Sequence, residues 1–537
     1  MQIYPKAFVI LMASATIIDP MAVSAQTVND RQNLTPVGKM IETREVHHDY
    51  LKSLKDVATP ASPELRIREK ALLRPRPYTG VPDNFVLDTV TQITANAPKP
   101  GPLAPVATIG LNFDGVGQGF PGFTVASAPP DTQGAVGSTQ YFSIVNSAFA
   151  IFNKTTGARI VGASATKSLW AGFGGKCETA NDGDAFVKWD NAAQRWIVMQ
   201  FAVTPSTAPF FQCVAVSQTA DATGAYFRYA FSYQNFPDYP KFAVWPDGYY
   251  ITFNLFNPAG TAFLGALVCA YDRSKMLIGA AATQQCFQQA NTVDSLLPSD
   301  PDGSSPVPAG SPNFVLGLTP TGVRLYKFHA DFTTPANATF TGPTNITVAG
   351  YNQLCSATGT CIRQAGTTTR LDALGDRLNP RLSYRRYADG HEALVATHAV
   401  STGLRWYEIR NPNGAPTLFQ QGTYAPTSTT RWLGSVAQDK NGNFGIGYSA
   451  SSNTLSPAIR FAARAPTDTL GTLGVENTVI NGGGSQTGGL TRWGDYSAMV
   501  VDASDDCTFW FTSEYLKTNG SFNWSTRIAN FKLAGCQ

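Results

Sequence analysis

Arg492-Trp493-Gly494-Asp495 is the last of seven short polar segments that decide the fold, because each directly precedes an apolar stretch with strand character. The other six are Pro130-Asp131-Thr132, Gly183-Asp184-Ala185, Asp238-Tyr239-Pro240-Lys241, Ser311-Pro312-Asn313, Gly375-Asp376-Arg377 and Thr430-Arg431-Trp432. Their central residues lie 53 to 73 residues apart. A four-stranded blade of a β-propeller with its loops needs roughly 40 to 60 residues. The repeat therefore predicts an all-β fold, a seven-bladed β-propeller.

The sequence between the segments is typical of short strands joined by tight turns. Pro246-Asp247-Gly248, for example, separates two apolar runs with alternating character, as in a β-hairpin. The last repeat offers only three clear strands, at residues 496–501, 507–513 and 526–533. We therefore expect residues 107–112, on the N-terminal side, to supply the closing strand. Two packed β domains are the structural alternative.

The N-terminal region reads differently from the rest of the chain. Residues 1–25 resemble a signal peptide, with an apolar run at 7–18 and Val23-Ser24-Ala25 before the expected cleavage site. Residues 26–105 are expected to form an N-terminal extension and Pro-rich linker, with two short helices in the charged stretch 46–73; a removable prosegment is the alternative. Residues 106–537 are assigned to the propeller domain. The mature protein should be secreted, periplasmic or extracellular, without a membrane span.

Eight cysteines in an exported chain indicate disulfides. Their positions within single repeats or loops predict four local bridges: Cys177–Cys213, Cys269–Cys286, Cys355–Cys361 and Cys507–Cys536. A structural zinc site is disfavoured, because the chain has no Cys-x-x-Cys and its five His residues are scattered.

Charge and motifs exclude several classes of function. A net charge of +3 gives no electrostatic case for nucleic acid or an acidic membrane surface as partner. The chain contains no Gly-x-Ser-x-Gly and no His-Glu-x-x-His, so a nucleophile-elbow hydrolase and a zinc protease are unsupported. Asn181-Asp182-Gly183-Asp184 and Ser299-Asp300-Pro301-Asp302-Gly303 have spacing that calcium loops use, although metal-free Asp-Gly turns explain both equally well. No other cofactor is predicted.

Several stretches resemble a family of secreted bacterial β-propeller proteins of uncharacterised function, over roughly residues 106–537. The resemblance is carried by Pro129-Pro130-Asp131-Thr132-Gln133-Gly134, Asp238-Tyr239-Pro240-Lys241, Arg492-Trp493-Gly494-Asp495-Tyr496-Ser497 and Asp505-Asp506-Cys507-Thr508-Phe509-Trp510. It implies export and a propeller distantly similar in architecture to sialidase-type glycosidases. The sialidase turn motif Ser-x-Asp-x-Gly-x-x-Trp is absent, so sialidase chemistry is not implied.

Candidate site residues follow if the seven segments meet at one end of a central channel. The catalytic candidates are Asp131, Asp184, Asp238, Asp376, Asp495, Tyr239 and Tyr496. The substrate-binding candidates are Lys241, Arg377, Arg431, Trp432, Arg492 and Trp493. Crowded carboxylates and cations can leave one acid protonated and another ionised, as glycosidases require. The structural alternative is that the Asp residues cap backbone N–H groups and the Tyr residues face a blade interface.

The pattern favours a protein that binds an extracellular polysaccharide and cleaves it, as a glycosidase or lyase. The alternative is a non-catalytic carbohydrate- or protein-binding surface or adhesion module. We expect it to act as a monomer on a glycan partner.

Overall fold

The computed structural model describes residues 37–60, 68–69, 86–93 and 107–537. These described residues belong to one compact unit. The predicted signal peptide lies outside the described residues. Within them almost all of the regular secondary structure is β-strand, which confirms the all-β class.

Antiparallel pairing arranges most strands into four-stranded groups, each starting from an inner strand. The first three groups are β7 (Gln133–Val136), β8 (Gln140–Val145), β9 (Ala148–Asn153) and β10 (Arg159–Ala165); β11 (Gly183–Asp190), β12 (Arg195–Ala202), β13 (Phe210–Ser217) and β14 (Tyr226–Tyr233); and β15 (Phe236–Val244), β16 (Tyr249–Phe256), β17 (Phe263–Tyr271) and β18 (Thr283–Gln288). The next two are β19 (Leu297–Pro301), β20 (Asn313–Thr319), β21 (Gly322–His329) and β22 (Thr339–Thr347); and β25 (Asn379–Arg386), β26 (Glu392–Val400), β27 (Gly403–Arg410) and β28 (Thr417–Tyr424). The last two are β29 (Thr430–Gln438), β30 (Phe444–Ser451), β31 (Ala458–Arg464) and β32 (Asn477–Ile480); and β33 (Ala498–Val501), β34 (Phe509–Leu516), β35 (Trp524–Leu533) and β5 (Ala107–Asp114).

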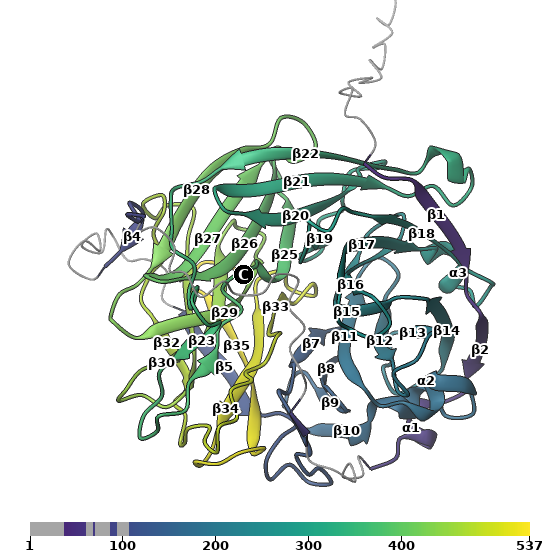
Figure 1. Cartoon of the computed structure of the whole chain (residues 1–537), viewed down its shortest axis with the longest axis horizontal. Helices are drawn as coiled ribbons and strands as arrows, with labels where there is room; N and C mark the ends of the chain where they lie inside the picture. Colours follow the sequence, from purple (N-terminus) through teal and green to yellow (C-terminus); the bar gives the residue numbers. More distant parts are fainter. Residues whose placement is uncertain (1–36, 61–67, 70–85, 94–106) are drawn as a thin grey trace, which may run out of the picture. The chain divides into compact units, whose positions relative to one another are not determined.

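The inner strands of these groups form a closed ring. Each of β7, β11, β15, β19, β25, β29 and β33 lies against the next, and β33 lies against β7 (Figure 1). Between β19 and β25 the contact becomes a short parallel ladder at Ser299–Pro301. This is the β-propeller that the sequence predicts. The count of seven is our interpretation of this ring in the described residues, and we call the groups blades 1 to 7 in chain order.

Apolar side chains hold neighbouring blades together. One buried cluster contains Met199 of blade 2 with Ile251 of blade 3, and another contains Phe461 of blade 6 with Phe531 of blade 7. The rings of Phe461 and Phe531 stack with centroids 3.9 Å apart. Because burying a large apolar side chain contributes roughly 1.5–3 kcal/mol, these interfaces supply much of the stability of the ring.

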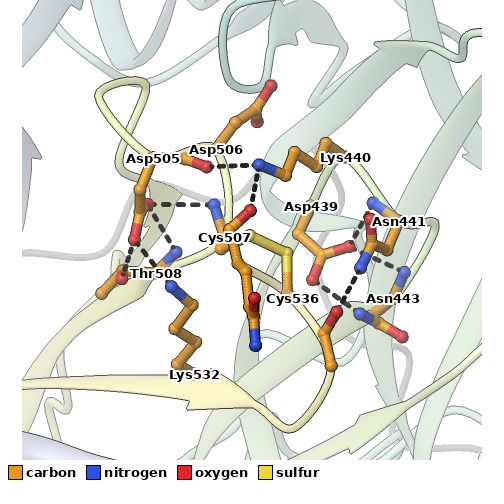
Figure 2. The surroundings of a disulfide bond; sticks show 12 residues. Asp439, Lys440, Asn441, Asn443, Asp505, Asp506, Cys507, Thr508, Lys532 and Cys536 are labelled. Carbon is orange, nitrogen blue, oxygen red and sulfur yellow. Dashed lines mark hydrogen bonds and ion pairs between the residues drawn. A yellow bond between two sulfur atoms is a disulfide. The ribbon is translucent and has the colours of Figure 1, made fainter.

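The last blade closes with a strand from the N-terminal side, as predicted. Strand β5 pairs antiparallel with β35 and is the outer strand of blade 7. All four predicted disulfides are present, and Cys507–Cys536 joins the start of β34 to the end of β35. Figure 2 shows that this bridge lies beside the turn of blade 6 that carries Lys440, whose Nζ donates to the carbonyl oxygen of Asp505 at 3.2 Å.

Three of the described strands before residue 94 lie along the outer edges of blades, and a fourth pairs with a strand ahead of blade 1. Strand β1 (Met40–Arg44) pairs with β18, and β2 (His47–Leu51) pairs with β14. Strand β4 (Thr91–Gln92) pairs with β28. Strand β3 (Arg68–Glu69) pairs with β6 (Ser127–Ala128). The predicted first helix is largely wrong: only α1 (Leu54–Val57) is helical, and His47–Leu51 is a strand. The open edge of β14 offers backbone partners that an isolated short helix lacks. The predicted second helix falls mostly outside the described residues.

The remaining elements are short connections. They are η2 (Thr166–Trp170), α2 (Gly175–Thr179), α3 (Arg273–Met276), η3 (Pro335–Asn337), β23 (Thr360–Ile362) and β24 (Leu371–Asp372). In the described ranges, none of the helices has the length and apolar character needed to cross a membrane.

One of the seven predicted segments is misplaced. Ser311-Pro312-Asn313 precedes β20, the second strand of blade 4, and the inner strand β19 instead follows Asp294 and Ser295. Strand β19 has the sequence Leu-Pro-Ser-Asp-Pro, which reads as a turn because proline cannot donate to a ladder.

Candidate functional site

The inner strands begin with strained, bulged backbone. Asp131, Asp184 and Tyr239 have φ values of 51°, 43° and 53°, in the left-handed region that disfavours residues with a side chain. Such conformations cost on the order of 1–3 kcal/mol each and cluster at functional sites. In β11 and β15 the pairing register also shifts at this end, between Gly183 and Phe186 and between Asp238 and Lys241. A bulge re-aims the side chains around it, so these polar groups can point towards their neighbours in other blades.

Asp131 and Asp184 tie blades together. Asp131 Oδ1 accepts a hydrogen bond from the backbone N–H of Asp495 at 2.7 Å, and its Oδ2 accepts one from Asn146 Nδ2 at 2.5 Å. Asn146 Oδ1 in turn accepts from the backbone N–H of Asp184 at 2.8 Å. These bonds connect blades 7, 1 and 2. They match the structural alternative for Asp131, since its carboxylate caps a backbone donor of a neighbouring blade.

The two tyrosines meet at the same end of the ring, in the blade interface. The rings of Tyr239 and Tyr496 are 5.2 Å apart, and Tyr496 Oη donates to Asp184 Oδ2 at 3.2 Å. Both side chains are buried. Burial raises the pKa of each phenol, and neighbouring carboxylates such as Asp184 raise that of Tyr496 further. A phenol that resists ionisation is a poor nucleophile or base, so the catalytic role expected of these residues is not favoured.

Two cations lie over the ring of Tyr239. Lys241 Nζ is 3.4 Å and the Arg377 guanidinium 5.0 Å from its centroid, distances typical of cation–π contacts. Arg377 also binds the Asp376 carboxylate through two bonds, of 2.9 and 3.0 Å. Burial, together with the charge of Arg377, lowers the pKa of Lys241 well below its usual range, although Asp238 opposes this shift. Lys241 Nζ has no hydrogen-bond partner in the described part of the chain.

Asp238 has the protonation state best suited to acid catalysis. As a whole residue it is less buried than Asp131 and Asp495. Burial and the nearby charge of Asp495 raise the pKa of Asp238 to about 7, even though Lys241 and Arg377 favour its ionised form. Near neutral pH a substantial fraction of Asp238 therefore carries a proton.

Two carboxylates that the sequence did not single out lie beside the last polar segment: Arg492 pairs with Asp372, and the backbone of Gly494 binds Glu514. The Arg492 guanidinium lies 2.8 Å from Asp495 Oδ1 and 2.5 Å from Asp372 Oδ2. Burial raises the pKa of Asp372 to about 6, and burial also raises that of Glu514, which accepts a hydrogen bond from Gly494 N at 2.8 Å. Glu514 could have been found as a lone charge within the apolar strand β34, whereas Asp372 lies in a two-residue strand without any motif.

Three predicted substrate-binding residues do not fit that role. Trp432 and Trp493 are 0% and 1% exposed and lie 6.0 Å apart inside one apolar cluster, so neither indole can stack on a sugar. Arg431 is turned to Glu476, with Nε–Oε2 at 2.6 Å, and to carbonyl oxygens of its own loop. For Arg431 and Trp432, which lie in β29, the cause is that alternate residues of a strand face opposite sides; Trp493 lies in the loop before β33.

In the two segments with calcium-loop spacing, 181–184 and 299–303, carboxylates bind donor groups of the protein itself. Asp182 accepts from the backbone N–H groups of Val203 and Thr204, and Asp300 binds Lys188 and Arg381. The described residues contain no group of three or more His, Cys, Asp or Glu side chains arranged to hold a metal ion. Calcium binding stays an untested prediction.

Known proteins offer only distant similarities. No family model matches the chain, and no curated protein does. Among solved structures, it is similar to an ulvan lyase from a new family of polysaccharide lyases, at 12% identity over 77% of this chain and 97% of that one, with a TM-score of 0.33. It is similar to an endo-arabinase from Bacteroides thetaiotaomicron, at 11% identity over 66% of this chain and 94% of that one, with a TM-score of 0.28. It is also similar to the WD40 domain of SCAP from fission yeast, at 10% identity over 74% of this chain and 79% of that one, with a TM-score of 0.31. At these values none of them assigns the chain to a family.

Proposed function

We propose that the protein is secreted, binds an extracellular polysaccharide where the inner strands begin, and hydrolyses it with Asp238 as general acid. The observation that carries the proposal is the pKa of Asp238, which burial and the charge of Asp495 raise to about 7, in a residue less buried than Asp131 and Asp495. A general acid must be protonated at working pH and must reach the leaving-group oxygen. The four disulfides support export, because such bridges persist in oxidising compartments.

The second carboxylate of the pair would be Asp495. Glycosidases set one carboxyl group as acid and keep another ionised, by giving them different surroundings. Arg492 binds Asp495 at 2.8 Å, and the charge of Asp495 raises the pKa of Asp238. Hydrolysis is favoured over elimination, because Tyr239 and Tyr496 are buried phenols with raised pKa and supply no ready base.

A non-catalytic binding module is the second candidate. It is favoured by the hydrogen bonds that Asp131 and Asn146 make between blades, since groups that hold blades together need not act on a substrate. In that case the strained end of the ring would recognise a glycan without cleaving it.

A polysaccharide panel tests the proposal. The mature protein would be incubated with neutral and uronate-containing polysaccharides, measuring both new reducing ends and the ultraviolet absorbance of unsaturated uronates. We expect reducing ends without unsaturated products. Asp238→Asn should lower the rate by about 100- to 10,000-fold, the usual contribution of a general acid.

Asp389→Asn, the same change in an exposed turn, is the matched control and should leave the rate unchanged. Unsaturated products would show that the protein cleaves by elimination and not by hydrolysis. Binding without either product would favour the non-catalytic module. Full activity of Asp238→Asn would refute our assignment of the acid.

A further inference from the structure

The opposite end of the ring contains a cavity that the proposed function does not use. It has a volume of about 360 Å³ and is lined by the ends of inner strands, including Val136, Asp190, Val244, Pro301 and Val501. A narrow space of about 20 Å³, lined by both Lys241 and Lys188, lies between this cavity and the strand starts. We call the larger space the strand-end cavity.

The walls of the strand-end cavity are mostly apolar. Trp189, Trp245, Pro246, Pro306 and Val307 line it. Trp189 is only partly buried, and Pro246 and Pro306 are exposed, so the aromatic and proline surfaces reach the opening. Small-molecule sites typically have volumes of about 300–1,000 Å³, apolar and aromatic walls and a few polar groups. The cavity has the size and lining of such a site.

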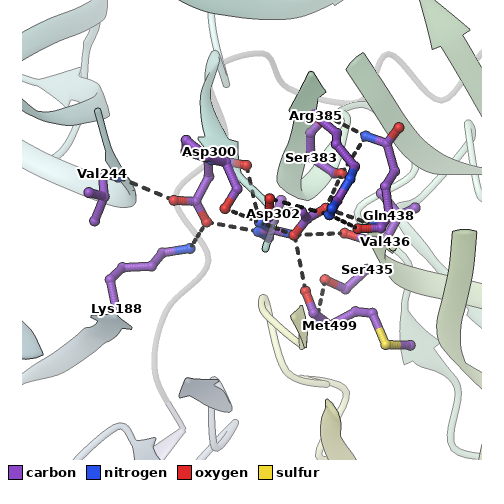
Figure 3. Close-up of polar contacts among 12 residues, drawn as sticks. Lys188, Val244, Asp300, Asp302, Ser383, Arg385, Ser435, Val436, Gln438 and Met499 are labelled. Atoms are coloured by element: carbon purple, nitrogen blue, oxygen red, sulfur yellow. Dashed lines mark hydrogen bonds and ion pairs between the residues drawn. The ribbon is translucent and has the colours of Figure 1, made fainter. Parts of the chain in front are cut away.

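Buried charged side chains also line the cavity, and we call Lys188, Asp300, Asp302 and Arg381 its floor; Figure 3 labels the first three of them. Asp300 Oδ2 accepts hydrogen bonds from Lys188 Nζ at 2.7 Å and from Arg381 Nε at 2.8 Å. The other nitrogens of Arg381 donate to the carbonyl oxygens of Val436 at 3.2 Å and Asp300 at 3.1 Å, and one lies 2.6 Å from Asp302 Oδ1. Each nitrogen of the guanidinium therefore already has an acceptor within the protein.

Lys188, by contrast, has hydrogen-bond donors that no described acceptor occupies. Its ammonium group has three N–H donors, and Asp300 is its one hydrogen-bond acceptor among the described residues. The residue is only 6% exposed and lines the strand-end cavity. A buried donor without an acceptor costs about 1–3 kcal/mol, more for a charged group, so the cavity offers a position where an acceptor would be stabilised.

An anionic acceptor suits this floor best. Burial lowers the pKa of Lys188, and the charge of Arg381 adds to the shift against the opposing effect of Asp300. Burial also raises the pKa of Asp302, against the opposing charge of Arg381. A carboxylate beside Lys188 would favour its charged form and could accept its remaining donors in short, charge-assisted hydrogen bonds.

We propose that the strand-end cavity binds a small aromatic monocarboxylate, with its ring against Trp189 and Pro246 and its carboxylate on Lys188. This site is separate from the glycan site proposed at the strand starts, and neither depends on the other.

Ligand-observed NMR on the full mature chain tests this inference with phenylacetate as probe. Phenylacetamide, which has the same shape without the charge, is the matched comparison. We expect phenylacetate to bind at least tenfold more tightly, and Lys188→Met to remove that preference. Lys167→Met, at an exposed lysine, should leave it intact.

Ala192→Trp gives a second test that spares the buried charges. Ala192 is exposed and lines the cavity, so a large side chain there should block both probes without disturbing the floor. The inference is overturned if wild-type protein binds neither probe or binds both equally. Unchanged phenylacetate binding in Ala192→Trp would also overturn it, and would do so even if Lys188→Met failed to fold.

Discussion

At Asp238, burial and the charge of Asp495 favour the protonated form, and two nearby cations favour the ionised one. The sequence could predict that carboxylates and cations gather here, because Asp and Lys stand together in Asp238-Tyr239-Pro240-Lys241. The sequence could not predict which of these Asp residues is the least buried, because that depends on the direction in which each β-bulge points a side chain. The same limit explains the two misassigned tryptophans, Trp432 and Trp493, whose side chains lie together in a buried apolar cluster.

The raised pKa of Asp238 predicts a pH dependence of stability. Its pKa rises from 3.8 in the unfolded chain to about 7 in the folded protein, so the folded state binds this proton more tightly. The stability it contributes is complete below pH 4 and is lost as the pH rises through 7, by on the order of a few kcal/mol. Asp238→Asn should therefore flatten the fall in the free energy of unfolding between pH 4 and 7, measured by denaturant titration. An unchanged pH slope in the variant would show that Asp238 titrates normally.

Among the strands, the closing element could be predicted and one inner strand could not. Strand β5 was expected because blade 7 had only three strands of its own, and the four disulfides followed from the proximity of their cysteines in the sequence. Strand β19 was missed because two prolines in five residues contradict ordinary strand preferences. The neighbouring β25 gives it a short parallel ladder, a long-range pairing that no local pattern reveals.

The bridge between Cys507 and Cys536 should be the more stabilising of two comparable disulfides. It spans 29 residues, whereas Cys355–Cys361 spans 6. Loop-closure entropy then predicts a loss of about 3.5 kcal/mol for the double Cys→Ser variant of the first pair and about 2 kcal/mol for the second. Equilibrium unfolding in guanidinium chloride measures both. Equal losses would indicate that the longer bridge does not constrain the closing blade as the loop model requires.

For the whole molecule, the repeat was visible in the sequence because each blade must begin at the same end of the ring. The strand-end cavity was not, because it combines residues of many blades that share no motif. The two ends also differ in character. Bulged, strained backbone and hydrogen bonds between blades mark the strand starts, whereas apolar walls over a buried ionic floor mark the strand ends.

The central claim is that a saccharide binds where the inner strands begin, within reach of Asp238. A crystal structure of the Asp238→Asn variant, soaked with an oligosaccharide of the polysaccharide that the wild-type protein binds in the panel, tests it most directly. We expect the sugar at the strand starts, with a glycosidic oxygen within hydrogen-bond distance of residue 238. A sugar bound in the strand-end cavity or on an outer blade edge, with the strand starts empty, would contradict the account.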